Sequence, residues 1–405
     1  MAENGIDIQL RCAEPEELED FLHVMCRVFD LPFEIAKIVF FSDPFLNNEN
    51  NLVLMLNSQI VSCLTLLSLE AMIGGNEVRM GGIAGLATLP EHQRKGYAAR
   101  LMNYAFEVCK ERDLQFVVLD PSDINYYRKR GWFEISRSVC YELRHEEHDY
   151  VSDEIAVRSV IHDDLVEMDF LRFHQMKHSL GRVRGEINWM QIVKKRPKSK
   201  VAINETGEVV GYMLVEEDLG HVGLSKPEVP PGLVVVELYA EHTEAANALL
   251  SAIHEPGFDK IDIMGEENEL ATLGVRAYPP KIRTAIAPSM GRLISFQGML
   301  NSLLSILPEI TDPVKMECRF EKVIEVITLG RDCDGRLIMI DDSSLNCYHH
   351  IAGNEEGWLK VLTGYLSAEE ALTMNLLSAN SDYARETAIS LFPARHPHMS
   401  EADRF

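Results

Sequence analysis

The chain has 405 residues, of which 46% are hydrophobic and 25% charged, and its formal net charge is −24 at pH 7. A chain of this length is expected to form two or three domains. The acidic balance argues against nucleic acid and anionic membranes as partners, because both attract basic surfaces, and it suits either a cationic substrate or solubility alone.

The first 145 residues alternate between strand-like and helix-like patterns. The apolar run 8–12 predicts a strand, and the acidic run that opens at Glu14-Pro15 predicts a helix ending near Phe29. Further strands are expected at residues 51–57, 60–69 and 78–89. With the two motifs described next, the order is one strand, a helix, three strands, a helix, a strand, a short helix and a strand.

The most informative run extends from Gly82 to Met102, where an apolar strand, a loop of positive and small residues, and an amphipathic helix (about Gln93 to Arg112) follow one another. A helix start exposes unpaired N–H groups and the positive end of the helix dipole, so an anion such as a diphosphate fits there. The loop Gln93-Arg94-Lys95-Gly96-Tyr97-Ala98 resembles motif A of the GCN5-related N-acetyltransferases (GNAT). The alternative is a glycine-containing turn with a packing role only.

The resemblance to motif A implies two sets of cofactor-binding residues. The strand would contact the pantetheine arm of acetyl-CoA through backbone groups of Leu86, Ala87 and Thr88, and these groups would also polarise the thioester carbonyl. The loop and first helical turn would hold the pyrophosphate through Arg94, Lys95, Gly96, Tyr97, Ala98 and Ala99. His92 either contacts phosphate as well or is a solvated loop residue.

The second motif extends from Phe116 to Ile135 as a buried strand, a turn, a short helix and a Gly-Trp-Phe entry into another strand. It resembles motif B of the same family, which implies that Tyr127 protonates the departing CoA thiolate. Tyr126 is the alternative acid. The alternative for Tyr127 is that its ring has a packing role only. Ser122 and Asp123 are assigned to cofactor binding, and either of them could instead cap the short helix.

Two further regions follow the charged linker 144–149. Residues 149–286 show a looser strand and helix order without a pyrophosphate loop, which resembles a GNAT domain that has lost its cofactor site. From about Ala287 the pattern changes to an apolar helix ending near Leu307, two or three strands between residues 316 and 341, a short element at 358–363, a Ser367-capped helix and a last helix at 382–391. This order resembles the sterol-carrier-protein-like fold.

The expected fold class is therefore α/β (α+β), with two GNAT-type mixed-sheet domains (1–148 and 149–286) followed by a sterol-carrier-protein-like domain (287–405). This three-part layout, together with the acidic, Pro-containing tail 392–405, resembles the Eis (enhanced intracellular survival) family. The resemblance implies that the α-carboxylate of Phe405 enters the first domain as general base, and that the protein forms a hexamer. The alternative for the tail is a frayed, inert chain end.

The cysteines and the N-terminal residues indicate a reducing, cytoplasmic location. The eight cysteines are scattered without a C-x-x-C pair or zinc spacing, so neither disulfides nor a metal are expected. The polar residues 1–7 do not resemble a signal peptide, and no apolar run reaches the length of a membrane span.

The sequence thus predicts an acetyl-CoA-dependent N-acetyltransferase that needs no metal. The substrate would be a cationic compound with several primary amines, resembling an aminoglycoside or a polyamine, and Asp30 and Glu401 are candidate contacts for it. Protein lysine acetylation is the first alternative. A sensor that binds acetyl-CoA without turnover, or a lipid-binding role for the third domain, is the second.

Overall fold

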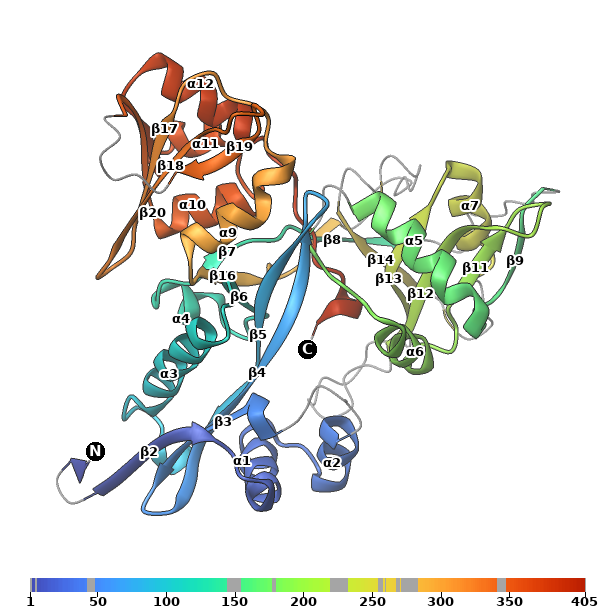
Figure 1. The fold of residues 1–405 in the computed structure, drawn as a ribbon. Helices are drawn as coiled ribbons and strands as arrows, with labels where there is room; N and C mark the ends of the chain where they lie inside the picture. Colours follow the sequence, from blue (N-terminus) through green and yellow to red (C-terminus); the bar gives the residue numbers. More distant parts are fainter. Residues whose placement is uncertain are drawn as a thin grey trace.

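The computed structural model of the protein describes residues 2–3, 6–41, 48–143, 154–176, 180–218, 232–253, 258, 260–266, 270, 283–340 and 347–404. Three sheets with their helices form three lobes, and the last described residues lie where the lobes meet (Figure 1). The expected mixed α/β class with several mixed sheets is confirmed.

The first lobe is built on a sheet with the strand order β1-β2-β3-β4-β5-β6-β16-β7, to which β10 adds by pairing with β4. Its strands are β1 (Ala2–Glu3), β2 (Ile6–Cys12), β3 (Asn51–Leu56), β4 (Gln59–Ile73), β5 (Asn76–Thr88), β6 (Phe116–Leu119), β7 (Phe133–Glu134), β10 (Gly181–Arg182) and β16 (Met290–Leu293). Its helices are α1 (Leu18–Phe29), α2 (Phe33–Phe41), α3 (Tyr97–Glu111) and α4 (Ile124–Arg128). The strands and helices expected before residue 135 are all present, and α2 was not foreseen.

Strand β16 comes from residues far along the chain. It lies between β6 and β7 and pairs antiparallel with both, so that Met290 stands opposite Leu119 on one side and Glu134 on the other. The strand β8 (Val139–Leu143), which directly follows the second motif, pairs with the second sheet instead. The first sheet is therefore completed by residues about 150 positions beyond its own motifs.

Helix α3 begins later than the pattern suggested, at Tyr97 rather than near Gln93. Arg94 (φ 60°) and Gly96 (φ 80°) take left-handed conformations, which an α-helix does not tolerate, so the chain turns twice before the helix starts. From there Leu101, Ala105 and Val108 return every three or four residues to one face and pack on the sheet.

The second lobe has a sheet with the order β15-β8-β14-β13-β12-β11-β9. Its strands are β9 (Ala156–Ser159), β11 (Lys200–Ile203), β12 (Val209–Asp218), β13 (Gly232–Ala240), β14 (Lys260–Gly265) and β15 (Arg283–Ala285), together with β8. Helix α7 (Thr243–Ser251) packs on one face, while α5 (Leu165–Gln175) and α6 (Glu186–Lys195) pack on the other. Both faces are covered, which explains the near-continuous apolar character of β12 and β13.

The third lobe has the strand order β19-β18-β17-β20-β21. Its elements are α9 (Phe296–Leu303), β17 (Val314–Arg319), β18 (Ile324–Arg331), β19 (Leu337–Ile340), β20 (His349–Asn354), α10 (Glu355–Leu362), α11 (Ala368–Thr373), β21 (Leu377–Ala379) and α12 (Asp382–Leu391). The predicted cap of α11 is confirmed, since Ser367 Oγ accepts from the Glu370 N–H at 3.1 Å and Glu370 Oε2 accepts from the Ser367 N–H at 2.8 Å. The element at 358–363 is part of α10, and β20 was missed.

The first and third lobes share a hydrophobic core. One cluster of buried side chains joins Phe116 and Val118 of β6 to Phe296 of α9 and Trp358 of α10. The Arg292 guanidinium on β16 also donates to the buried Glu355 carboxylate through Nε at 3.0 Å and Nη2 at 2.8 Å. The domain boundaries at 148 and 286 and the sterol-carrier-like assignment stay predictions. None of the described helices is both long and apolar enough to cross a membrane.

Candidate active site

A pocket of about 430 Å³ lies where β5 ends and where α3 and α4 begin. It is lined by residues from three stretches that are distant in sequence, namely Val28, 86–99 and 122–130. The lining residues are Val28, Leu86, Thr88, His92, Gln93, Arg94, Gly96, Tyr97, Ala98, Ala99, Ser122, Asp123, Tyr126, Tyr127 and Arg130. The two sequence motifs thus form the walls of one cavity.

The loop before α3 leaves its main chain open to a ligand. A Cβ added at Gly96 would meet no other heavy atom within 4 Å, so its left-handed φ of 80°, and not crowding, accounts for the glycine. The Gln93 amide donates to the Thr88 carbonyl at 3.1 Å and fixes the loop to the end of β5. At the first turn of the 15-residue helix α3, N–H groups without intrahelical partners and the helix dipole favour an anion.

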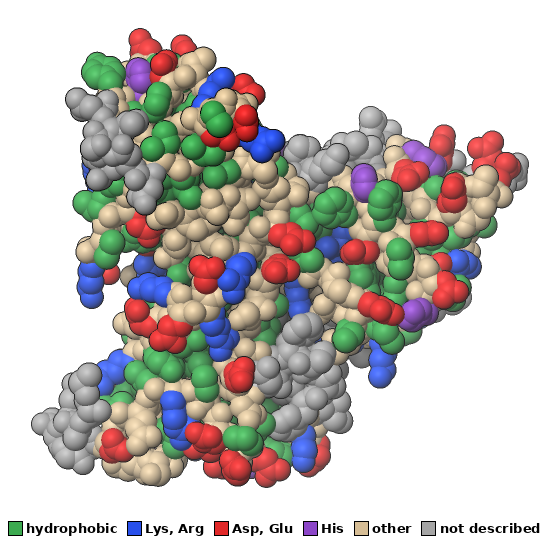
Figure 2. Space-filling model, viewed as in Figure 1, with side chains coloured by type: hydrophobic (Ala, Val, Ile, Leu, Met, Phe, Trp, Pro, Cys, Tyr) green, Lys and Arg blue, Asp and Glu red, His purple; other side chains and the backbone are tan. Residues whose placement is uncertain are grey.

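Cations gather at this pocket even though the chain as a whole is strongly acidic. Arg94 and Arg130 both contribute to its lining. In the space-filling view, basic, acidic and hydrophobic side chains are interspersed over the face that includes α3 and α4, without a continuous basic surface (Figure 2). The positive charge is therefore confined to the pocket and does not extend over the surrounding surface, which suits the binding of a small anionic group.

A β-bulge interrupts the pairing of β4 with β5 beside the pocket. Thr65 stands opposite Ala84 and Cys63 opposite Ala87, so Gly85 and Leu86 bulge out of the regular ladder. Gly85 has a φ of 60°, and a Cβ there would lie 2.1 Å from the Met25 methyl carbon, which makes glycine the residue that fits. The bulge releases backbone groups at Leu86 from the ladder, next to the cavity.

Tyr127 lies in the pocket wall with its ring packed edge-on against Trp132, their centroids 6.0 Å apart. Burial raises the pKa of the Tyr127 phenol, and the neighbouring Tyr126 adds to the shift. The phenol therefore stays protonated throughout the neutral range and can act as a proton donor. Tyr126 is placed differently, because the Arg130 guanidinium lies over its ring at 3.6 Å from the centroid.

Asp123 caps α4, since its Oδ1 accepts from the N–H groups of Asn125 at 2.9 Å and Tyr126 at 3.2 Å. The capping role considered for this residue is therefore present, and it orients the helix that carries Tyr127. Asp123 and Ser122 also line the pocket.

The structure brings together most of the predicted site residues. Those that line the pocket are Leu86, Thr88, Arg94, Gly96, Tyr97, Ala98, Ala99, Ser122, Asp123 and Tyr127. Ala87 is buried against α1 and does not line the pocket, and neither does Lys95. Phe405 lies outside the described residues. Within the described part of the chain, no three His, Cys, Asp or Glu side chains are grouped as a metal ion would require.

Sequence reasoning did not assign several residues near the pocket. Gln93 belongs to the motif A loop but had no predicted role of its own, and Arg130 had none either, although it follows Tyr126 by one helical turn. Asp120, at the carboxyl end of β6, accepts from Ser289 Oγ at 2.7 Å and lies 3.6 Å from Arg404 Nε. The position of Asp120 directly after an apolar strand was the available signal for it.

Segment 397–404 lies between the first and second lobes. The Arg137 N–H donates to the Pro397 carbonyl at 2.8 Å, and the buried His398 Nδ1 is 2.7 Å from Ser138 Oγ. Ser400 Oγ donates to the carbonyl of Val236 on β13 at 3.3 Å. The segment is therefore bound to both lobes through its own side chains and backbone.

The buried His398 makes the stability of this region pH-dependent. Burial lowers the pKa of His398 to about 4, whereas an unfolded histidine titrates near 6.5. On acidification the unfolded chain therefore takes up the proton first, and the stability present above about pH 6.5 declines as the pH falls toward 4. Between about pH 7 and about pH 5 the wild type should lose unfolding free energy through His398, and we expect this loss to be about 2 kcal/mol smaller in His398→Gln.

Denaturant unfolding of the wild type and the variant at both pH values measures this difference. The exposed His174 provides the control, because His174→Gln should leave the pH dependence unchanged. Equal pH dependence in wild type and His398→Gln would show that His398 does not control it.

Comparisons with known proteins agree with this geometry. Residues 9–135 match the family model of the acetyltransferase (GNAT) domain. A GCN5-related N-acetyltransferase from Anabaena variabilis ATCC 29413 superposes with a TM-score of 0.78 at 17% identity, covering 98% of this chain and 100% of that one. No curated protein sequence matches the chain.

Two further solved structures are similar over their full length. A GCN5-related N-acetyltransferase from Kribbella flavida has a TM-score of 0.76 at 18% identity and covers 99% of both chains. Eis1 from Mycobacterium abscessus has a TM-score of 0.69 at 16% identity, covering 98% of this chain and 100% of that one. At these identities the likeness is one of fold, and it extends over all three lobes.

Proposed function

We propose that this chain, of which residues 9–135 match the acetyltransferase (GNAT) domain, moves the acetyl group of acetyl-CoA to a primary amine of a small cationic compound with several amines. The observation that carries the proposal is that the loop before α3 and Tyr127 line the same pocket. The loop supplies the place for the pyrophosphate, and the phenol supplies a proton to the leaving thiolate.

Each part of the pocket has a role in the proposed reaction. The N–H groups of α3 and the Arg94 guanidinium hold the diphosphate. Backbone groups released by the bulge at Leu86 stabilise charge on the thioester oxygen. The amine nitrogen attacks the carbonyl carbon, the carbon–sulfur bond breaks, and Tyr127 donates its proton to the sulfur.

The amine must lose a proton to a base in the same reaction. The resemblance of the tail to the Eis family implies the α-carboxylate of Phe405 for this role, and that assignment stays a prediction. Arg404, which precedes Phe405 in the chain, lies against Asp120. Asp120 in turn is two positions before Ser122, which lines the pocket. This proximity supports a contribution of segment 397–404 to the acceptor side of the site.

The cationic substrate is supported by carboxylates near this segment. Glu401 is half-buried, and burial raises the pKa of its carboxyl, while the Arg404 guanidinium lowers that pKa and the charge of Asp120 raises it. Arg404 already lies between Glu401 and Asp120, so a protonated amine would bind beside this guanidinium or in its place. Asp30, the other residue considered, is exposed at the C-terminal end of α1 and does not line the pocket.

Arg94 provides a test of the cofactor site. We expect Arg94→Gln to weaken acetyl-CoA binding about tenfold, since a charge-assisted hydrogen bond to phosphate at an exposed position is lost. The loss should shrink at high salt, because screening weakens the wild-type contact as well. Titration calorimetry at low and high salt measures both effects.

The control for Arg94 is Lys129, an exposed cation in the second motif that does not line the pocket. Lys129→Gln removes the same charge and should leave the affinity for acetyl-CoA within about twofold. If both variants weakened binding equally, the general charge of the region would explain the effect and Arg94 would have no specific role.

The function itself is tested by measuring CoA release from acetyl-CoA with a panel of polyamines and aminoglycosides, a lysine-containing peptide, and no acceptor. Turnover with the multi-amine compounds is the expected result. Preference for the peptide would favour protein lysine acetylation, and acetyl-CoA binding without turnover in any arm would favour the sensor. A fatty acid that stabilises the protein against heat would point to a ligand of the third lobe.

We also propose association into a homo-oligomer, a hexamer by the Eis resemblance. Val166, Phe170 and Phe173 are exposed along one side of α5, and hydrophobic side chains gather over this helix in the space-filling view (Figure 2). Exposed apolar side chains at this spacing favour contact with another protein surface.

A further inference from the structure

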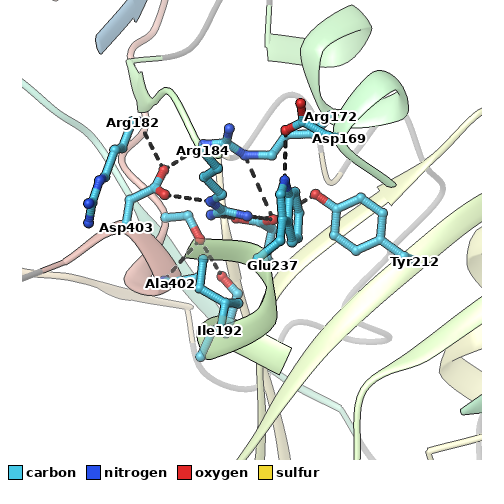
Figure 3. Close-up of polar contacts among 12 residues, drawn as sticks. Asp169, Arg172, Arg182, Arg184, Ile192, Tyr212, Glu237, Ala402 and Asp403 are labelled. Carbon is cyan, nitrogen blue, oxygen red and sulfur yellow. Dashed lines mark hydrogen bonds and ion pairs between the residues drawn. The ribbon is translucent and has the colours of Figure 1, made fainter. Parts of the chain in front are cut away.

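Asp403 is the most deeply buried charged residue of segment 397–404, with a side chain only 1% exposed. Its Oδ2 accepts from Arg172 Nη2 at 2.6 Å and from the Arg182 backbone N–H at 3.0 Å. Its Oδ1 accepts from Arg184 Nε at 2.7 Å. Figure 3 shows the carboxylate enclosed by these groups, with Glu237 on the other side of Arg184.

The contacts extend into a balanced ionic cluster, which we define as Arg172, Arg184, Glu237 and Asp403. The Arg184 guanidinium, also fully buried, donates to both oxygens of Glu237, at 2.8 and 2.6 Å. Tyr212 donates its hydroxyl hydrogen to Glu237 Oε1 at 2.7 Å. Arg184 and Arg172 hold the pKa of Glu237 well below its usual range despite the burial. Two positive and two negative charges are therefore paired in the interior.

The members of this cluster come from four separate parts of the fold. Arg172 is on α5 and Glu237 on β13 of the second lobe. Arg184 follows β10, the short strand that pairs with β4 of the first lobe. Asp403 belongs to the last short helical turn, Glu401–Asp403. The carboxylate of Asp403 is thus the point where the end of the described chain is attached to both lobes.

A buried ionic cluster of this kind contributes little net stability, because desolvation offsets most of the attraction between the charges. A hydrophobic side chain at position 403 would anchor the segment to an apolar core at lower cost. What the carboxylate adds is geometry, since three donors from three directions fix the position of both oxygens.

The geometry fixed in this way determines where the next residue lies. Arg404 places Nη1 2.7 Å from Glu401 Oε1 and Nε 3.6 Å from Asp120 Oδ1. Asp120 connects β6 to the residues Ser122 and Asp123 of the pocket wall. Neither Arg404 nor Asp120 lines the pocket itself, and Arg404 Nε and Asp120 Oδ2 are buried without hydrogen-bond partners among the described residues, so this contact leaves two polar atoms unsatisfied behind the pocket wall.

We propose that Asp403, held by Arg172 and Arg184, is a positioning residue that sets segment 397–404 against the carboxyl end of β6 and so completes the acceptor-amine side of the pocket. This inference rests on the proposed function. The proposal assigns a role in the reaction to the second lobe. None of the described residues of that lobe lines the acetyl-CoA pocket, but the lobe supplies Arg172 and Glu237 to the cluster.

The test is Asp403→Asn, which keeps the size of the side chain but replaces one acceptor oxygen by a donor facing an arginine. We expect faster amide hydrogen exchange in residues 398–404, about a 100-fold lower kcat with an amine, and an acetyl-CoA Kd within about twofold of wild type. The exchange measurement needs no turnover, and the Kd reports whether the first lobe is intact.

The matched control is Asp164→Asn. Asp164 is another buried carboxylate of the second lobe, paired with both terminal nitrogens of Arg158 at 2.7 and 2.6 Å, and it does not touch segment 397–404. Its replacement should lower Tm while leaving kcat and the exchange of residues 398–404 unchanged. If Asp403→Asn only lowers Tm in the same way, the residue has a structural role and the proposal is wrong.

A second variant covers the case in which Asp403→Asn does not fold. Asp403→Glu keeps the charge but is one methylene longer, so it should fold, displace Arg404 and lower kcat by about tenfold with the acetyl-CoA Kd unchanged. Wild-type kcat in Asp403→Glu would overturn the proposal. If the wild-type protein acetylates no amine, the proposed function fails, and unchanged exchange in the Asp403 variants would separately show that the cluster does not hold the segment.

Discussion

Replacing Tyr127 by phenylalanine is expected to lower kcat by about 10²- to 10⁴-fold, because the thiolate would leave without a positioned proton donor. The acetyl-CoA Kd should stay within about twofold, since the ring still packs against Trp132 and the loop before α3 is untouched. Burst and steady-state assays of CoA release, with calorimetry of acetyl-CoA binding, separate the two quantities.

Tyr126 is the control for this prediction because it is adjacent and lines the same pocket. Its ring lies under Arg130, and Tyr126→Phe is expected to change kcat by no more than a few-fold. The reverse order of effects would assign the acid to Tyr126. Full activity in both variants would mean that the thiolate is protonated by solvent, and the acid role proposed for Tyr127 would be abandoned.

The largest loss of stability is expected for Arg184→Leu. The substitution leaves the Glu237 and Asp403 carboxylates buried with only Arg172 to balance them, which should cost about 3–5 kcal/mol of unfolding free energy. By contrast, Arg128→Leu breaks an exposed ion pair with Glu134 and should cost no more than about 1 kcal/mol. Urea unfolding of the two variants measures the contrast.

A double variant distinguishes the charge imbalance from simple loss of packing. Replacing Arg184 and Glu237 together by leucine removes one charge of each sign and leaves Arg172 paired with Asp403, so the loss should be smaller than the sum of the two single losses. Additive losses would show that the pair is not coupled. Because the pKa of Glu237 is lowered, its stabilising effect is present above about pH 4.3 and is lost as the pH falls below that value.

The local parts of the site were accessible from the sequence, because their chemistry depends on residues that are close together along the chain. The apolar spacing of α3 and a cap at Ser122 or Asp123 follow from patterns within a few residues. The same holds for the Ser367 cap and for α12, whose bounds Asp382–Leu391 were predicted without error. The left-handed turn at Arg94 and Gly96, by contrast, was missed, because the helix was expected to begin near Gln93.

The long-range parts were not accessible, since no local pattern records which strand pairs with which. Nothing around Met290 indicates that β16 pairs with β6, and nothing around Val139 indicates that β8 leaves the first sheet for the second. The ionic cluster was even less accessible from the sequence. In a sequence that is 25% charged, nothing distinguishes its four members from ordinary surface charges, namely Arg172, Arg184, Glu237 and Asp403. Only the tertiary fold shows that they are buried together.

The position of β16 also determines how late the first sheet can be completed while the chain is being synthesised. Strand β6 emerges from the ribosome with one edge unpaired, and its partner β16 follows only after residue 293 has been made. At ordinary rates of translation this delay is on the order of ten seconds or more. During that interval the nascent chain exposes an apolar strand edge next to the incomplete acetyl-CoA pocket, which makes it a target for chaperones and for aggregation.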